Sequence, residues 1–273
     1  MKKLTIILAL LISIPSFGFE GGPIVPTSSY LNSFLSIDDQ QLSTGASFDS
    51  FLKKLEKKQQ TIRREKDFVR FIFTKTHQEY LKSYKPYASF NELFNKGDYN
   101  CLTGTILYAL VLNHFGIQYE VIETNYHIFL TVETKQGKIL LEATDPLEGF
   151  VDTDRGIEKR IATYKQNTLI ATNSKLNHYQ FSFDLYKTVS LEELQGLLYY
   201  NKAVDSFNHQ QLEKSIRFLE KAHELYSSSR IHEFSMILLL AVQQSEWSAE
   251  MKEKYLHVIY SISEKNSLIA SLH

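Results

Sequence analysis

Residues 99–117 read YNCLTGTILYALVLNHFGI, and this stretch decides how the chain folds. Nearly every position from 107 to 112 is apolar, and a glycine follows near the end of the run. An apolar run without a polar face is typical of a helix that is buried on all sides, and glycine is a common helix stop. Asp98 or Asn100 can cap its first turn. We therefore predict a largely buried helix that begins at or next to Cys101.

The residues after this stretch predict an antiparallel β meander. Three short segments rich in β-branched or aromatic residues follow it, at residues 119–124, 127–134 and 138–144. Residues 135–138, Lys-Gln-Gly-Lys, form the hairpin turn between the last two. Upstream, apolar residues spaced by three and four over 48–84 predict two helices, or one long helix bent near Gln60. Helices followed by a meander place the fold in the α+β class.

The N-terminus has the three-part form of a secretory signal peptide. Two lysines precede an apolar run over residues 4–14, and small residues follow at Ser16 and Gly18. We predict cleavage after Gly18 and export, either to the periplasm or out of the cell. The run is shorter than the roughly 20 apolar residues that a membrane helix requires, so we expect no stable span after cleavage. Residues 19–47 are rich in Gly, Pro, Ser and Thr and predict an irregular arm.

Charge and cysteine content narrow the possible functions. The 273-residue chain carries 30 Lys plus Arg and 31 Asp plus Glu, a formal charge of −1 at pH 7, and its basic residues are scattered. We therefore expect no nucleic-acid partner. The histidines show no metal-ligand spacing with acidic residues, so we expect no metal site. We also expect no cofactor. The single cysteine, Cys101, cannot form an intramolecular disulfide, and it is either a small buried apolar residue or a reactive thiol.

Three polar residues fall at informative places in this plan. Cys101 lies at a helix N-terminus, where unpaired N–H groups and the helix dipole favour a thiolate. His127 opens the second strand, and Asp145 closes the third strand just before a proline. Because antiparallel neighbours run in opposite directions, the start of one strand lies opposite the end of the next. We therefore predict that His127 and Asp145 are neighbours at one rim of the sheet.

A thiol, an imidazole and a carboxylate suit nucleophilic catalysis. The imidazole takes the thiol proton and returns it to a leaving amine, while the carboxylate holds the imidazole in the right tautomer. The N–H of Cys101 is the natural first donor to an oxyanion. The second donor has four candidates: Asn100, Gln78, Tyr80 and Tyr84. Glu133 and Glu142 are expected to face one another loosely on the hairpin, without the paired environment that an acid–base dyad needs.

These features resemble the bacterial transglutaminase-like superfamily, which is related to papain. The resemblance rests on the buried-helix stretch, on the strand that begins with His127, and on the strand that ends in Thr-Asp-Pro at 144–146. It covers about residues 65–150, and it departs from the commonest pattern in having Ile128 and Phe129 after the histidine. The resemblance implies a triad with Cys101 as nucleophile, His127 as general base and acid, and Asp145 as orienting carboxylate.

The resemblance also implies a division into domains. A transglutaminase-like catalytic domain is expected over residues 48–189, in a papain-like fold. Residues 190–273 predict helices throughout, two of them joined near Asn208 with the spacing of a tetratricopeptide-like hairpin. Since three or more repeats are normally needed for independent stability, we expect these helices to pack on the catalytic domain.

Two functions remain open at this point. The first is an exported cysteine protease, amidase or acyltransferase that acts on a protein or peptide through a thioester acyl-enzyme, with hydrolysis favoured over transfer to an amine. The second is an inactive transglutaminase-like scaffold whose C-terminal helices bind a protein partner.

Overall fold

The computed structural model describes residues 26–38, 45–165 and 185–270, and it has the expected α+β class. The predicted signal peptide and its cleavage site lie outside the described residues. The main sheet is antiparallel, in the order β6-β5-β4-β3-β7. Its strands are β3 (Tyr119–Thr124), β4 (Ile128–Thr134), β5 (Gly137–Leu141), β6 (Phe150–Val151) and β7 (Tyr186–Val189). The predicted meander is thus confirmed, with one further short strand at each edge.

Helices make up most of the remaining described residues. They are α1 (Thr27–Leu35), α2 (Gly45–Gln59), α3 (Glu65–Tyr80), α4 (Phe90–Lys96), α5 (Cys101–His114), α6 (Asp154–Lys165), α7 (Leu191–Asn208), α8 (Leu212–Leu225), α9 (Ser229–Gln244) and α10 (Ala249–Ala270). A parallel strand pair, β1 (Ser83–Tyr84) with β2 (Asp98–Tyr99), leads into α5. Among these helices, none combines the length and apolar character needed to cross a membrane.

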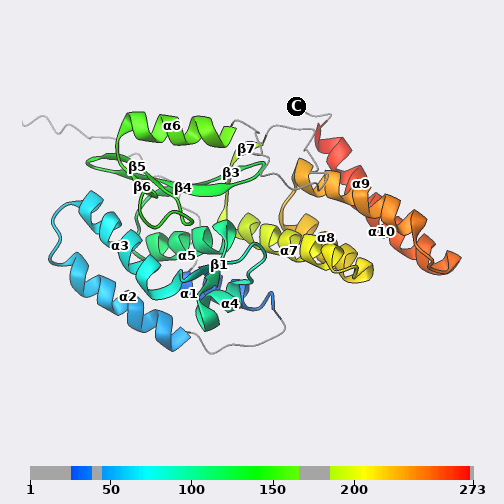
Figure 1. Ribbon diagram of the computed structural model, residues 1–273, viewed down its shortest axis with the longest axis horizontal. Coiled ribbons are helices and arrows are strands. Elements are labelled where there is room, and N and C mark those ends of the chain that lie inside the picture. Colours follow the sequence, from blue (N-terminus) through cyan, green and yellow to red (C-terminus); the bar gives the residue numbers. More distant parts are fainter. Residues whose placement is uncertain (1–25, 39–44, 166–184, 271–273) are drawn as a thin grey trace, which may run out of the picture.

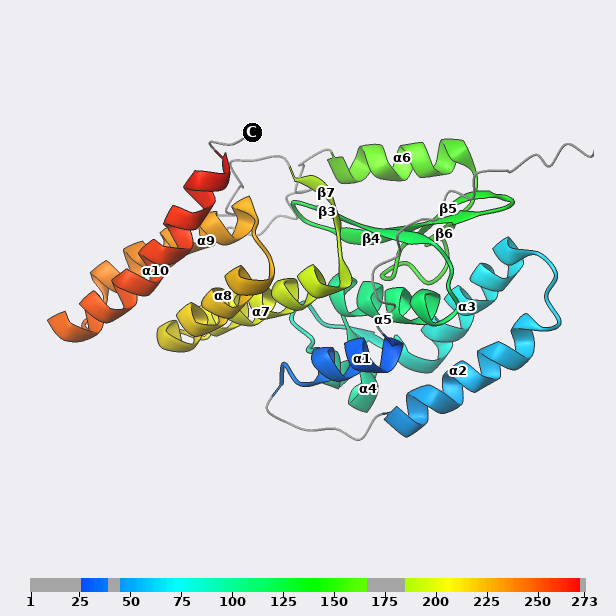
Figure 2. The same cartoon turned by 180° about the vertical axis from the view of Figure 1, so that it is seen from behind.

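The elements form layers around the sheet. In Figures 1 and 2, α6 covers one face, α5 covers the other with α3 beside it, and α1, α2 and α4 pack beyond them. The α6 face buries a small cluster that includes Phe129, Leu140 and Ile157. The larger core lies on the α5 side and continues into α7 to α10, which extend to one side of the sheet. The two faces therefore have separate apolar clusters.

Helix α5 is the centre of the core, as its sequence predicts. Asn100 caps it, because its side chain accepts from the N–H of Thr103 while the Thr103 hydroxyl accepts from the N–H of Asn100, both at 2.9 Å. The Tyr108 hydroxyl is buried and donates to a main-chain carbonyl of α3 at 2.9 Å. Gly104 lets α5 approach the end of the sheet, since a Cβ there would lie 2.8 Å from that of Ala143. The glycine thus brings the Cys101 end of the helix close to the sheet rim.

The N-terminal part differs from the sequence expectation in one place. Residues 27–35, which were expected to belong to an irregular arm, form helix α1. Its Leu31, Phe34 and Leu35 are buried, and their spacing of three and four places them on one helical face. This apolar stripe outweighs the surrounding turn-forming residues. Residues 60–64 are not helical and separate α2 from α3, so the two-helix alternative is confirmed.

The C-terminal helices form one packed region with the rest of the fold. Helices α7 and α8 form a hairpin and α9 and α10 form a second one, as Figure 1 shows. Helix α7 packs on α5 and also contacts α1 through a 2.6 Å hydrogen bond from Gln195 to Ser33. Tyr30 of α1 donates to Glu192 at 2.6 Å. The expected packing of this region on the α/β part is confirmed.

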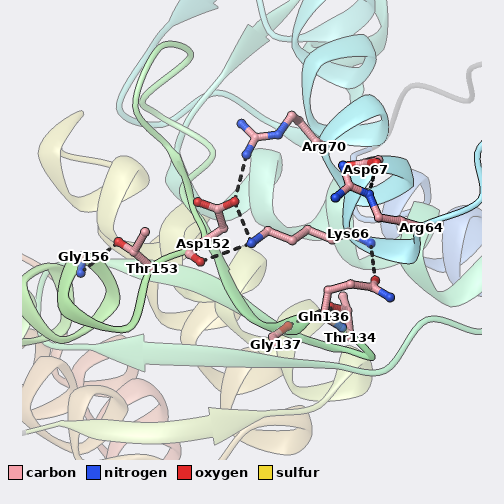
Figure 3. Close-up of polar contacts among 10 residues, drawn as sticks. All are labelled: Arg64, Lys66, Asp67, Arg70, Thr134, Gln136, Gly137, Asp152, Thr153 and Gly156. Carbon is pink, nitrogen blue, oxygen red and sulfur yellow. Dashed lines mark hydrogen bonds and ion pairs between the residues drawn. The ribbon is translucent and has the colours of Figure 1, made fainter.

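A charged cluster joins α3 to the sheet. Asp152, which follows β6, lies 2.9 Å from Nζ of Lys66 and 2.9 Å from Nη2 of Arg70 (Figure 3). The hydrogen bond and charge of Lys66, together with the charge of Arg70, lower the pKa of Asp152. The main-chain N–H of Lys66 also donates to Gln136 in the hairpin turn. These contacts fix the start of α3 on the sheet.

Candidate thiol site

Cys101 is the first residue of α5 and lines a small cleft together with His127. The cleft has a volume of about 140 Å³, and Cys101 remains partly exposed in it. Both parts of the molecule supply its walls. The other lining residues are Pro86, Leu102, Glu123, Tyr126 and Ile128 from the α/β part, and Leu197, Asn201 and Arg230 from α7 and α9. The thiol therefore faces a cleft that the helical region completes.

His127 lies directly before β4, as predicted. Its side chain is 19% exposed, and Nε2 forms a hydrogen bond and ion pair with Oε2 of Glu142. Burial alone would lower the pKa of His127, but hydrogen bonds and charge from Cys101 and Glu142 outweigh it and raise the pKa to about 10. The protonated imidazole is thus favoured beside the thiol.

Glu142 is the carboxylate beside the imidazole, and it is held from several sides. Its side chain is only 2% exposed. Oε1 accepts from the N–H of Thr144 at 2.8 Å and from its hydroxyl at 2.7 Å, and Oε2 accepts from the Tyr164 hydroxyl at 2.9 Å. Burial acts to raise the pKa of Glu142, but the hydrogen bonds and charge of His127, with the bonds from Thr144, hold it below the usual value. The carboxylate is therefore fixed in one orientation.

Asp145 lies elsewhere, which differs from the sequence prediction. Its Oδ2 forms a 2.6 Å ion pair with Arg160 of α6, and its Oδ1 accepts from the N–H of Glu148 at 2.9 Å. Burial acts to raise the pKa of Asp145, but the bonds from Glu148 and Arg160 outweigh it and lower the pKa. The structure thus brings Cys101 and His127 together as predicted, and it pairs Asp145 with a surface turn and α6 instead.

The strand register explains the difference. Strand β5 ends at Leu141, which pairs with Leu130, so continuing the register places Glu142 opposite Phe129. Residues 127 and 129 share a face because side chains alternate along a strand, and Glu142 therefore lies on the face of His127. Asp145 comes after the chain has left the strand. Counting along the hairpin predicts the correct rim, but the carboxylate that binds His127 there is Glu142.

The expectation about the two hairpin glutamates was wrong for the same reason. Glu133 pairs with Lys138 in the register, and their side chains form a 3.0 Å ion pair. Glu142 does not face Glu133. It has the paired environment, with His127, that the sequence interpretation did not assign to it.

Tyr164 of α6 is a site residue that the sequence interpretation missed. Its ring centre lies 4.6 Å from that of His127 and 5.0 Å from that of Phe129, and its hydroxyl reaches Glu142. Burial and the neighbouring charge of Glu142 raise the pKa of Tyr164 above the usual range. A signal was present, because Ile157 and Tyr164 are spaced as one face of an amphipathic helix.

The four oxyanion-donor candidates lie in different surroundings. The amide nitrogen of Asn100 donates to the carbonyls of Pro86 and Ala88, each at 3.1 Å. Gln78 accepts from Lys75 on the exposed side of α3, and Tyr80 is buried in an aromatic cluster. Tyr84 is 53% exposed, and burial together with the charge of Cys101 raises its pKa. Of the four candidates, Tyr84 combines an exposed side chain with a pKa that the charge of Cys101 influences.

The described side chains form no group of three or more His, Cys, Asp or Glu that could hold a metal ion. Comparison with known proteins gives no relatives: no family model matches the chain, and no curated protein or solved structure matches it either. The arrangement of Cys101, His127 and Glu142 must therefore be interpreted from its own chemistry. A partly exposed thiol, an imidazole and a buried carboxylate can together carry out proton-coupled attack on a carbonyl carbon.

Proposed function

We propose that this chain is a transglutaminase-like cysteine enzyme that acts on amide or peptide bonds, with Cys101 as nucleophile, His127 as base and acid, and Glu142 as orienting carboxylate. One observation carries the proposal: His127 shares a cleft with the thiol while its Nε2 is bound to a buried, fully hydrogen-bonded carboxylate. A histidine held in this way has one ring nitrogen committed and the other available to the thiol. Asp145 has no part in this proposal.

The reaction follows from these positions. His127 already holds the thiol proton before the substrate binds, so Sγ of Cys101 attacks the substrate carbonyl carbon as a thiolate. The tetrahedral intermediate collapses when the C–N bond breaks, and His127 gives the proton to the leaving amine. A thioester remains on Cys101. Water then gives a proton to His127 and attacks the thioester, and the C–S bond breaks to restore the Cys101 thiolate beside the protonated imidazole.

The oxyanion of the tetrahedral intermediate needs donors. The N–H groups of the first turn of α5 have no acceptor within their own helix, so the N–H of Cys101 is the first donor. We assign the second to the Tyr84 hydroxyl, because β1 pairs with the strand that leads directly to Cys101 and because Tyr84 is exposed. Helix α5 supplies its positive dipole end to the same charge.

The partial exposure of Cys101 favours hydrolysis over transfer to an amine, since water can reach a thioester there. The proposed substrate is a protein or peptide, and the proposed location is outside the cytoplasm, after removal of residues 1–18. The proposal retains a papain-like fold for the α/β part and a tetratricopeptide-like origin for α7 to α10.

A second function, binding of a protein partner, is favoured by exposed apolar side chains on the last two helices. Met236 and Leu240, one turn apart on α9, are 44% and 55% exposed, and Tyr260 on α10 is 47% exposed. Met236 and Leu240 share one face of α9, and exposed apolar side chains that lie together are typical of contact surfaces. This function requires the fold and these side chains but not the thiol.

Alkylation and peptide hydrolysis by the purified chain test the enzyme proposal. Because the sequence has one cysteine, iodoacetamide adds mass only at Cys101, and the folded protein should react faster than the unfolded one at pH 7. Mixed glutaminyl peptides, with and without a primary amine, report hydrolysis and transfer together. Cys101→Ala should abolish both and leave the unfolding temperature unchanged. Reaction of the thiol only after unfolding would contradict the proposal.

A further inference from the structure

Arg230 reaches from the helical region into the wall of the thiol cleft. It is the second residue of α9, its side chain is 14% exposed, and it lines the same cleft as Cys101 and His127. Its guanidinium carbon lies 5.4 Å from the ring centre of Tyr200 on α7. A buried arginine needs partners for both its charge and its donors, because an isolated buried charge is costly.

The carbonyls that Arg230 binds belong to the loop that carries His127. Its Nη2 donates to the carbonyl of Thr124 at 2.8 Å and to that of Asn125 at 2.9 Å. Thr124 in turn closes the loop: its N–H donates to the carbonyl of His127 at 2.8 Å, and its hydroxyl accepts from the N–H of His127 at 3.1 Å. A shift of Thr124 and Asn125 therefore moves the imidazole with them.

Glu123 and Tyr226 complete the contact between the two parts. Nε of Arg230 lies 2.9 Å from Oε1 of Glu123, which is only 2% exposed. The Tyr226 hydroxyl, at the end of α8, donates to the other carboxylate oxygen. Helix α7 passes very close to Tyr226, because a Cβ on Gly196 would lie 2.4 Å from the Cβ of Tyr226. The helical region thus fixes Glu123, Thr124 and Asn125, which lead from the end of β3 into the loop that carries His127.

We propose that Arg230 is a positioning residue for His127, and that the helical region is therefore a working part of the thiol site and not a separable module. This rests on the proposed thiol function, because it concerns how the imidazole of that site is held. Binding two neighbouring carbonyls with one nitrogen and a carboxylate with another uses the rigid fork of arginine, which lysine lacks. Geometry of this kind matters, since a displacement of about 1 Å costs enzymes roughly 10²-fold in rate.

The test follows the alkylation of Cys101 by iodoacetamide against pH, by intact mass, in the full chain. Arg230→Gln should lower the rate at pH 7 by about 10- to 10²-fold and change the pH profile, because the imidazole loses its place beside the thiol. Arg230→Lys should recover part of the rate. Gln195→Ala is the matched control, since it removes a hydrogen bond between the two parts outside the cleft. It should stay within about twofold of wild type.

A second variant guards against loss of the fold. Arg230→Gln leaves Glu123 buried without its cation, so Glu123→Met combined with Arg230→Met removes both charges together. A folded double variant with the altered profile of Arg230→Gln supports the proposal, and a folded double variant with the wild-type profile overturns it. If the wild-type thiol reacts no faster in the folded than in the unfolded protein, the proposed function itself fails. If the wild-type thiol does react faster and the double variant keeps its profile, only the positioning role of Arg230 fails.

Discussion

Two carboxylates of this molecule, Glu142 and Asp152, each follow a β-strand and each bind several donors, but in opposite surroundings. Glu142 is 2% exposed and accepts hydrogen bonds from an imidazole, a phenol and a threonine. Asp152 is 24% exposed. Figure 3 shows that it binds Lys66 and Arg70. The donors of Glu142 are two packed rings and a threonine, whereas those of Asp152 are long, flexible side chains.

The two residues show how the same functional group, a carboxylate, can serve two purposes. A lysine or arginine at the surface must give up rotamer freedom to hold one geometry, and its charge is screened by water and salt. Packed donors around Glu142 lose little freedom when they bind, so the carboxylate can impose one orientation on His127. Asp152 joins α3 to the sheet, whereas Glu142 holds the ring of His127. Removing each should therefore have very different effects.

The largest expected effect follows from Glu142→Gln. The neutral amide of glutamine lacks the charge that keeps the imidazole protonated and oriented. Hydrolysis should therefore fall by about 10²- to 10⁴-fold, by analogy with the measured triad carboxylate of serine proteases. Breaking this buried pair should also lower the free energy of unfolding by about 3 kcal/mol. Peptide hydrolysis and urea unfolding measure the two effects.

Asp145→Asn is the matched control for that prediction. Its ion pair with Arg160 is 29% exposed on both sides, so its loss should cost at most about 1 kcal/mol. Alkylation of Cys101 should be unchanged. A loss of activity as large as that of Glu142→Gln would instead restore Asp145 to the triad.

How far the sequence could predict this site depends on the range of the contacts. The helix that starts at Cys101 and the strands around His127 follow from local periodicity and capping, and both were predicted correctly. Which carboxylate binds His127 depends on the residue at which β5 ends. One step of register moves a side chain to the other face, so the hydrophobic pattern alone could not separate Glu142 from Asp145.

Contacts that span long sequence separations could not be predicted at all. Tyr164 reaches Glu142 across 22 residues, and Arg230 reaches Thr124 across 106. A helical pattern around Tyr164 can predict α6 but not the face of the sheet that it covers. Nothing near Arg230 in the sequence indicates the loop that it binds, because that pairing exists only once α7 has packed on α5.

The second prediction concerns the protonation of His127. Its pKa of about 10 means that the imidazole keeps its proton through neutral pH, because Cys101 and Glu142 together outweigh burial. The C2 proton of His127, followed by NMR, should begin to shift only well above pH 8. In Glu142→Gln the midpoint should move down, while Asp152→Asn should leave it in place. A midpoint near 6.5 in the wild type would show that the buried pair does not form.

The third prediction concerns His77, a buried ring on α3 whose Nε2 has no hydrogen-bond partner among the described residues. Burial lowers its pKa to about 4, against the opposing charges of Asp145 and Glu142. The unfolded chain therefore binds a proton below about pH 6.5 that the folded chain does not, so stability is present above 6.5 and is lost as pH falls toward 4. The slope from this ring is at most about 1.4 kcal/mol per pH unit.

Urea unfolding between pH 4.5 and 6.5 isolates this effect, because the carboxylates with lowered pKa lose their contribution mainly at lower pH. His77→Phe should flatten the curve in this window. His209→Gln, at a histidine that is 67% exposed, controls for the loss of any imidazole. Equal slopes in all three proteins would show that His77 is protonated in the folded state.

The smallest effect is expected at Asp152. Because its partners are long side chains at the surface, Asp152→Asn should cost less than about 1 kcal/mol of unfolding free energy, and 0.5 M salt should shrink the difference. A double-mutant cycle with Lys66→Met measures the pair alone, and we expect a coupling of about 0.5 kcal/mol. Alkylation of Cys101 should be the same in all four proteins of the cycle. A cost above about 2 kcal/mol, or a slower thiol, would mean that the surface cluster also positions the site, and the contrast with Glu142 would no longer hold.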